Sequence, residues 1–287
     1  MVENLRISAS NFMKLVETFK QNGWEIPESD SENESRFNRF CKRLSILESE
    51  EQELIIDLTK NYMVINANEY LTHTLSLLNR LYKDGPEVFT KTTKFYVLPL
   101  IAPQDVKKTK SSQCMWYNFQ DEHIKLNPIF KGKKLIYCDQ TKFSWIQGIK
   151  ENEKVILLDD YIGSGETAIS AINWLSEQFG VHSNKMIVMS IAAQSLGLKQ
   201  IAEKSDAEVF TYFERNRGIS DTYEGDICDK NINTMLKIES KLKVEKEFEL
   251  GYNKSEALIS LIRTPNNTFP VFWKVNKKKE YAPFLRD

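Results

Sequence analysis

The stretch KVILLDDYIGSGETAISAINWL, residues 154–175, decides the expected fold. Its apolar run, residues 155–158, begins with β-branched side chains, which is typical of a strand covered on both faces in a parallel sheet. The chain then passes through residues that permit a tight turn and a helix cap, namely Gly163, Ser164, Gly165 and Thr167. Apolar residues at helical spacing follow. We therefore predict a strand, a tight loop and a helix.

The start of such a helix is suited to a phosphate, because backbone N–H groups and the positive end of the helix dipole meet there. Asp159 and Asp160 come where the strand ends, at the edge where open α/β sheets bind ligands. Carboxylates do not help to hold a phosphate. They suit sugar hydroxyls, a metal ion or a positive charge that develops on the ligand. A ribose 5-phosphate satisfies both halves of the pattern.

Other interpretations of this segment remain open. Two acids after a buried strand and a glycine-rich turn also occur in doubly wound proteins that bind no ribose. The chain contains no G-x-x-x-x-G-K-[ST], and no G-x-G-x-x-G follows a strand, so the P-loop and dinucleotide-binding classes lose support. A nuclease that uses the acids for metal is the weakest alternative, because adjacent residues of a strand point to opposite faces.

Residues 159–167 resemble the phosphoribosyl-pyrophosphate (PRPP) loop of the type I phosphoribosyltransferases. In that family the loop holds the 5-phosphate, and the acids face the ribose hydroxyls. The resemblance implies that Asp159 and Asp160 are the catalytic acids and that they reach Mg²⁺ indirectly, through the ribose and the pyrophosphate. It implies that Ser164, Gly165 and Thr167 hold the 5-phosphate and that Gly163 and Glu166 belong to the same ligand-binding loop. Glu166 departs from the family pattern, and its carboxylate is compatible with a phosphate only if it points to solvent.

The composition of the whole chain agrees with an α/β protein without selecting it. A hydrophobic content of 41% over 287 residues is enough for a buried core, and a net charge of −1 gives no global field that would attract nucleic acid. No signal peptide and no apolar run of membrane-spanning length is visible, so we expect a cytoplasmic protein that makes no membrane contact. The four cysteines lack C-x-x-C spacing, which argues against zinc.

Three regions are expected along the chain. Residues 1–91 form a helical N-terminal region, because apolar residues recur at helical spacing. Residues 92–215 alternate between predicted strands and helices, which indicates a mostly parallel sheet of phosphoribosyltransferase type. Residues 216–287 form a C-terminal hood or cap. The predicted fold class is α/β.

Further ligand-binding candidates lie outside the loop. The first strand leads into a segment without the basic residue and glycine of the family's pyrophosphate loop, so Lys108, Lys110 and Ser111 are either a displaced pyrophosphate clamp or a solvated surface. Arginines after the last strand suit a phosphate or a carboxylate, although an ordinary basic loop is the alternative. Asparagines in the hood can read a base edge or build a turn. These four residues are Arg215, Arg217, Asn266 and Asn267.

Together, the segments YVLPL, KTKSS, DDYIGSGET, RNRGISD and TPNNTFPVFW resemble the bacterial phosphoribosyltransferase-like proteins of conflict systems, including those that accompany retron reverse transcriptases. The resemblance implies a toxin effector of anti-phage defence that is restrained by a partner, such as a reverse transcriptase with its RNA or DNA. The expected activity is that of a transferase or a hydrolase that consumes PRPP. The competing hypothesis is a non-catalytic PRPP or nucleotide sensor. The acceptor, the trigger and the oligomeric state stay open.

Overall fold

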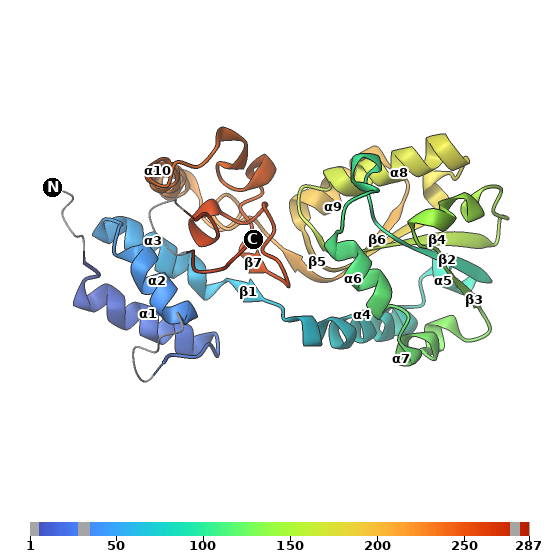
Figure 1. Cartoon of the computed structure of the whole chain (residues 1–287), viewed down its shortest axis with the longest axis horizontal. Helices are drawn as coiled ribbons and strands as arrows, with labels where there is room; N and C mark the ends of the chain where they lie inside the picture. The colour runs from blue at the N-terminus through green and yellow to red at the C-terminus, as the bar shows by residue number, and fades with distance from the viewer. Residues whose placement is uncertain (1–5, 28–34, 276–281, 287) are drawn as a thin grey trace. The chain divides into compact units, whose positions relative to one another are not determined.

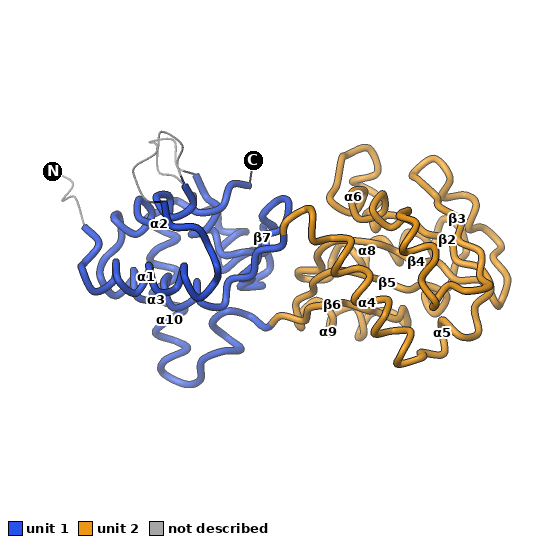
Figure 2. Tube along the Cα trace, turned by 90° about the horizontal axis from the view of Figure 1, so that it is seen from below, with its two compact units in different colours: residues 1–65, 216–287 blue, residues 66–215 orange. Residues whose placement is uncertain are grey.

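The chain forms two compact units, each with its own core (Figure 2). Unit 1 combines residues 1–65 with residues 216–287, and unit 2 is the continuous segment of residues 66–215. The structure is a computed structural model that describes residues 6–27, 35–275 and 282–286.

Unit 2 is built on a five-stranded sheet in which all neighbouring strands are parallel. In spatial order the strands are β3 (Lys134–Tyr137), β2 (Lys94–Pro99), β4 (Glu153–Ile162), β5 (Met186–Gln194) and β6 (Glu208–Arg215). Leu157 of β4 pairs with Leu98 of β2 and with Val188 of β5, so the predicted apolar run lies at the centre of the sheet. The predicted α/β fold with a mostly parallel sheet is confirmed.

Helices cover both faces of this sheet (Figure 1). One face carries α4 (Tyr70–Asp84) and α6 (Ser111–Asn118), and the other carries α8 (Glu166–Phe179) and α9 (Ser195–Lys204). The short helices α5 (Glu87–Thr90) and α7 (Glu122–Lys125) also belong to this unit. Helix α8 covers the sheet through apolar positions predicted from its helical spacing, namely Ala168, Ala171, Ile172 and Leu175.

Unit 1 packs helices around an aromatic core. Its helices are α1 (Ala9–Gln21), α2 (Arg36–Leu44), α3 (Ser49–Lys60) and α10 (Gly225–Lys241). Strand β1 (Met63–Val64) pairs in parallel with β7 (Ile259–Ser260). In the core, Tyr62 stacks on Phe284 with 4.3 Å between the ring centroids, and Phe40 contacts Phe272. The two ends of the sequence therefore share one core.

The units divide the expected helical region. The expected boundary at residue 215 coincides with the end of β6 and of unit 2, but α1 to α3 belong to unit 1, whereas α4 and α5 belong to unit 2. Helix α4 lies against β5 and β6 and buries Leu77, Leu78 and Leu81. Helical periodicity identifies such an apolar face but not the surface that it covers. The segment expected as a hood forms one unit with the N-terminal helices.

All four cysteines are free thiols. Within the described ranges, every helix is too short or too polar to span a lipid bilayer.

Candidate functional site

Strand β4 carries two acids near its carboxyl end, and Tyr161 and Ile162 continue the strand after them. Asp159 is half-buried and lines a cavity, whereas Asp160 is only 3% exposed. The N–H group of Asp160 donates to Oδ1 of Asp159 at 2.9 Å, and the hydroxyl of Tyr70 donates to Oδ2 of Asp160 at 2.7 Å. One acid therefore reaches the cavity, and the other is held inside the protein.

The electrostatics of Asp159 suit a polar ligand. Burial and the neighbouring charge of Asp160 raise the pKa of Asp159 well above its usual value, and the ammonium of Lys110 opposes this rise more weakly. Hydrogen bonds from ligand hydroxyls, or a nearby positive charge, would favour the charged carboxylate. Such a ligand would therefore lower the pKa of Asp159 toward its usual value.

The loop after β4, residues 163–167, leads directly into α8, and we call it the β4 loop. Gly165 is the N-cap of α8 and has a φ of 83°, in the region that favours glycine. It provides no side chain to cap the helix, whereas Ser8 and Ser35 cap α1 and α2 with their hydroxyls. The first turn of α8 therefore presents N–H groups and the positive end of the helix dipole without a side-chain cap.

The β4 loop packs against Gly197 in α9. A Cβ atom on Gly197 would lie 2.2 Å from the carbonyl oxygen of Gly163, and a Cβ atom on Gly165 would lie 2.8 Å from the carbonyl oxygen of Gly197. Because both contacts are with backbone atoms, neither position accepts a larger residue unless the backbone moves. The conformation of the loop is therefore fixed from two sides.

The cavity beside Asp159 has a volume of about 160 Å³. The β4 loop contributes Thr167 to its wall, and the segment after β2 contributes Lys110, Ser111 and Ser112. Among the described residues, the buried hydroxyl of Ser112 has no hydrogen-bond partner. The structure thus brings an acid, an ammonium group and several hydroxyls from separate parts of the sequence to one cavity.

Asp105 pairs with two lysines of the segment after β2. Asp105 forms salt bridges with Lys108 at 2.8 Å and with Lys110 at 2.7 Å. Burial acts to raise the pKa of Asp105, but the hydrogen bonds from the two lysines outweigh it and keep the pKa below its usual value. A phosphate bound in the cavity would share Lys110 with Asp105.

The family model PRTase-CE matches residues 37–286. The chain belongs to the PRTase-CE family. This confirms the phosphoribosyltransferase-like family of conflict-system proteins expected from the sequence. The match includes residues of both units, so unit 1 is part of what defines a PRTase-CE chain.

No curated protein matches this PRTase-CE chain. Among solved structures, the AQ2163 protein from Aquifex aeolicus matches with 18% sequence identity and a TM-score of 0.27. The matched region covers 49% of this chain and 65% of the AQ2163 chain.

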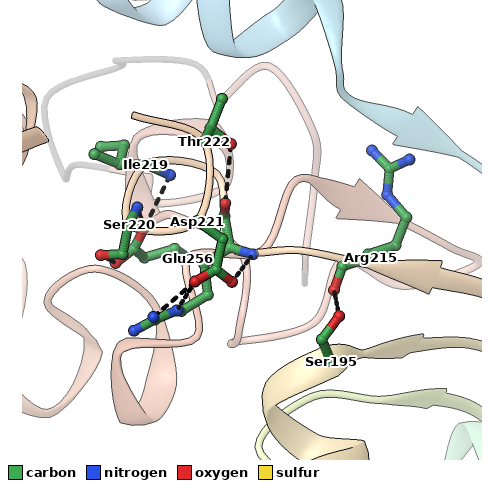
Figure 3. Close-up of polar contacts among 8 residues, drawn as sticks. Ser195, Arg215, Ile219, Ser220, Asp221, Thr222 and Glu256 are labelled. Carbon is green, nitrogen blue, oxygen red and sulfur yellow. Dashed lines mark hydrogen bonds and ion pairs between the residues drawn. The ribbon is translucent and has the colours of Figure 1, made fainter. Parts of the chain in front are cut away.

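Arg215 lies at the same edge of the sheet as the acids, because β6 runs parallel to β4 and ends at this residue. Its guanidinium is partly buried near Tyr161 of β4, and burial lowers its pKa. Its carbonyl accepts a hydrogen bond from the hydroxyl of Ser195 at 3.3 Å (Figure 3). Arg215 is thus placed with unit 2 and its site.

The other candidates belong to unit 1 and have partners there. Arg217 forms a salt bridge with Asp221 in its own turn, with 2.7 Å between Nη2 and Oδ1. Asn267 is buried and donates to the hydroxyl of Ser255 at 3.0 Å, and the carbonyl of Asn266 accepts a backbone N–H group. These contacts stabilise the fold of unit 1. Ligand binding by these three candidates stays a prediction.

The sequence-based analysis missed Tyr70, Asp105 and Gly197. A glycine in the first turn of the helix expected after β5 was a signal for Gly197, because glycine destabilises a helix unless something packs closely against it. An acid three residues before Lys108 was a signal for Asp105. Tyr70 gave no signal, since it fits the apolar pattern of α4 and its partner is far away in the sequence.

Proposed function

We propose that this chain is a phosphoribosyltransferase-like enzyme that binds PRPP, or a related phosphorylated ribose, at the carboxyl edge of the sheet in unit 2. The observation that carries the proposal is the uncapped, glycine-bounded start of α8 beside a cavity lined by Asp159. Membership of the PRTase-CE family supports the same class of ligand. The enzyme is a transferase, or a hydrolase that consumes PRPP with water as the acceptor.

The β4 loop holds the 5-phosphate in this proposal. The N–H groups of the first turn of α8 and the hydroxyls of Ser164 and Thr167 are the donors, and the helix dipole adds a favourable charge. Gly163 and Gly165 let the phosphate oxygens approach the backbone closely. Glu166 is exposed, so water screens its repulsion of the phosphate.

The acid pair fits a magnesium ion only together with a ligand. In the described part of the chain, no group of three or more histidine, cysteine, aspartate or glutamate side chains could hold a metal ion by itself. Mg²⁺ usually binds through one or two carboxylates plus substrate phosphates and water. Asp159 lines the cavity and would therefore meet an ion carried by the pyrophosphate and the ribose, whereas Asp160 would act on it only through Asp159. Bound there, Mg²⁺ supplies charge neutralisation for the pyrophosphate.

The reaction breaks the bond between C1 of the ribose and an oxygen of the pyrophosphate, and it forms a bond between C1 and the acceptor. Positive charge grows on the ribose as the first bond breaks, and the carboxylate of Asp159 stabilises this charge. Lys110 and the unpartnered hydroxyl of Ser112 are the proposed contacts of the pyrophosphate. The protein supplies positioning and electrostatic stabilisation, and no covalent nucleophile is needed.

One observation favours a second candidate function, a non-catalytic sensor of PRPP or a nucleotide that signals to a partner. Asp105 pairs with both Lys108 and Lys110, so the positive charge of this segment is partly neutralised before any pyrophosphate arrives. A weak pyrophosphate clamp is compatible with binding and slows the departure of the leaving group.

We propose further that the chain acts in the cytoplasm as a toxin effector of an anti-phage system, restrained by a partner such as a reverse transcriptase with its nucleic acid. Family membership supports this proposal. Asn266 and Asn267 stay the proposed ligand contacts of unit 1. If this is right, Asn266→Ala abolishes growth inhibition in cells while PRPP binding stays nearly intact.

Isothermal titration with PRPP and Mg²⁺, followed by an assay of pyrophosphate release, tests the proposal. Binding with release supports the enzyme, binding without release supports the sensor, and the absence of binding rejects both. Thr167→Ala should weaken PRPP binding about tenfold, because the phosphate loses a donor. Thr222→Ala is a matched control, since the Thr222 hydroxyl donates to the carbonyl of Arg217 in unit 1 at 3.2 Å. Asp159→Asn should lower turnover far more than phosphate affinity.

A further inference from the structure

The two aspartates near the carboxyl end of β4 differ in what holds them. Asp160 is 3% exposed, and its Oδ2 accepts a 2.7 Å hydrogen bond from the hydroxyl of Tyr70, which is fully buried. A hydrogen bond to a carboxylate is stronger than one between neutral groups, and its loss leaves a buried charge without that donor. The position of Asp160 therefore depends on a residue 90 positions earlier in the chain.

Tyr70 is itself held firmly. It is the first residue of α4, and its carbonyl accepts a hydrogen bond from the hydroxyl of Thr74 at 2.7 Å. The same hydroxyl contacts Sδ of Met115 in α6 at 3.7 Å. Because the ring of Tyr70 is fully buried and its helix packs on the sheet, the phenol cannot easily follow a displaced carboxylate.

The constraint on Asp160 reaches Asp159 through the backbone. The N–H group of Asp160 donates to Oδ1 of Asp159 at 2.9 Å, and this bond orients the carboxylate that lines the cavity. A shift of residue 160 would weaken this bond and turn the Asp159 carboxylate away from its present direction. The polar chain thus runs from Tyr70 through Asp160 to Asp159.

We infer that Tyr70 is a positioning residue, which holds Asp160 so that Asp160 in turn orients Asp159, the acid that meets the ligand. The inference rests on the proposed function for the identity of that ligand. It assigns recognition of the ribose to Asp159 and leaves the 5-phosphate to the β4 loop. The two parts of PRPP then depend on different residues, and one part can be weakened without the other.

Tyr70→Phe removes the hydroxyl and keeps the ring. We expect its affinity for PRPP to fall about tenfold or more, while its affinity for inorganic phosphate changes less than about twofold. Tyr82→Phe is the matched control, because Tyr82 lies on the same helix and is exposed, and both of its affinities should equal those of the wild type. A role in stability alone would lower both affinities of Tyr70→Phe together or leave both unchanged. Wild-type PRPP affinity in Tyr70→Phe overturns the inference and leaves the proposed function standing.

A double-mutant cycle tests the pair without PRPP. Tyr70→Phe and Asp160→Ala should each lower the melting temperature, and the double variant should melt no lower than the less stable single variant, because both changes remove the same hydrogen bond. Additive losses overturn the inference. If the wild type fails to bind PRPP, the proposed function is rejected, and the cycle decides about Tyr70 and Asp160 on its own.

Discussion

Two loops of this chain have similar sequences and different surroundings. The β4 loop reads GSGET at residues 163–167, and the loop after β6, here the β6 loop, reads GISDT at residues 218–222. Each follows a strand, begins with glycine, contains serine and ends with an acid and a threonine. By sequence pattern alone, either could hold a phosphate near the start of a helix.

The β6 loop is closed by acids of its own unit (Figure 3). Glu256 accepts hydrogen bonds from the N–H groups of Ile219 at 2.9 Å and of Ser220 at 2.8 Å, and from the Ser220 hydroxyl. Asp221 accepts from the N–H group of Arg217 at 2.9 Å and pairs with its guanidinium. Since these donors already have carboxylate acceptors, an anion would gain little there and would meet the charge of Glu256.

Among the described residues, the helix start of the β4 loop has no side-chain cap. Its own acid, Glu166, is exposed, and the neighbouring wall is the backbone of Gly197. What separates the two loops is a glutamate 36 positions away from Ser220. A ligand loop is therefore recognised by the acceptors around it and not by its own residues. Three of the following predictions, for Gly165, Glu256 and Arg217, test this contrast between an internally closed loop and an open one.

The largest expected effect concerns a second buried acid of unit 1. Glu239 accepts a hydrogen bond from the N–H group of Leu250 at 2.9 Å, and burial raises the pKa of Glu239 to about 8. Between about pH 4.5 and about pH 8 the folded protein keeps a proton that the unfolded chain releases, so the free energy of unfolding falls as the pH rises through this window. The total loss is about 5 kcal/mol.

Chemical denaturation at pH 5, 6.5 and 8 measures this loss against the variant Glu239→Gln, in which the dependence should largely disappear. Subtracting the free energies of unfolding of the two proteins removes the contribution of other groups that titrate in this range. One of these is His73, whose pKa is lowered by burial. If the free energy of unfolding depends on pH in the same way in both proteins, Glu239 is not held as a neutral acid in the folded protein.

The next effect is on the open loop. Gly165→Val places a β-branched residue at a φ of 83° and a Cβ atom 2.8 Å from the carbonyl oxygen of Gly197, so PRPP affinity should fall at least about 100-fold, or about 3 kcal/mol. Gly180→Val is the control, because Gly180 ends the same helix with a φ of 67° and has no atom within 4 Å of the added Cβ. Titration calorimetry compares the two. Equal affinities would remove the β4 loop from the ligand site.

A smaller effect is expected when the closed loop is opened. Glu256→Gln keeps an oxygen for the two backbone N–H groups, but it removes the charge that strengthens these bonds and places an N–H₂ group against the Ser220 hydroxyl, so unfolding should require about 2 kcal/mol less. Thermal denaturation measures this change, and the exposed Glu247→Gln is its control. PRPP affinity should stay within about twofold of the wild type. A large loss of affinity with unchanged stability would make the β6 loop a second ligand site.

The smallest effect is expected for Arg217→Ala. Its guanidinium is partly exposed and pairs with Asp221, so the loss of stability should stay below about 1 kcal/mol. PRPP affinity should change less than about threefold, because the ligand would otherwise have to displace Asp221. An affinity loss above about tenfold would support Arg217 as a ligand contact and contradict the view that the β6 loop is closed.

Much of the fold could be predicted because its signals are local. The strands of unit 2 are short apolar runs rich in β-branched residues, and the chain alternates between strand and helix patterns, which requires parallel pairing. The two-residue strands β1 and β7 could not be predicted, since each depends on a partner in a distant part of the sequence. The unit to which each helix belongs could not be predicted for the same reason. Leu77 and Leu81 of α4 show that the helix has an apolar face, but they do not show which core this face joins.

In the candidate site, too, the local signals could be predicted and the contacts between distant residues could not. Residues 159–167 are contiguous and could be recognised together, and Lys110 and Ser111 indeed line a cavity with Asp159. Tyr70 and Gly197 act through contacts with residues far from them in the sequence, and such contacts exist only after folding. The sequence shows which groups can do chemistry, whereas the packing shows which groups hold them in place.

The discontinuity of unit 1 has a consequence for biosynthesis. Residues 66–215 leave the ribosome as one uninterrupted stretch, whereas Phe40 and Tyr62 wait for Phe272 and Phe284 to complete their aromatic core. At usual rates of translation this delay is on the order of 10 to 40 s. During that time the sheet of unit 2 can already assemble while the α1–α3 segment lacks its partners. The apolar residues of the α1–α3 segment therefore wait longer for their packing partners than those of unit 2.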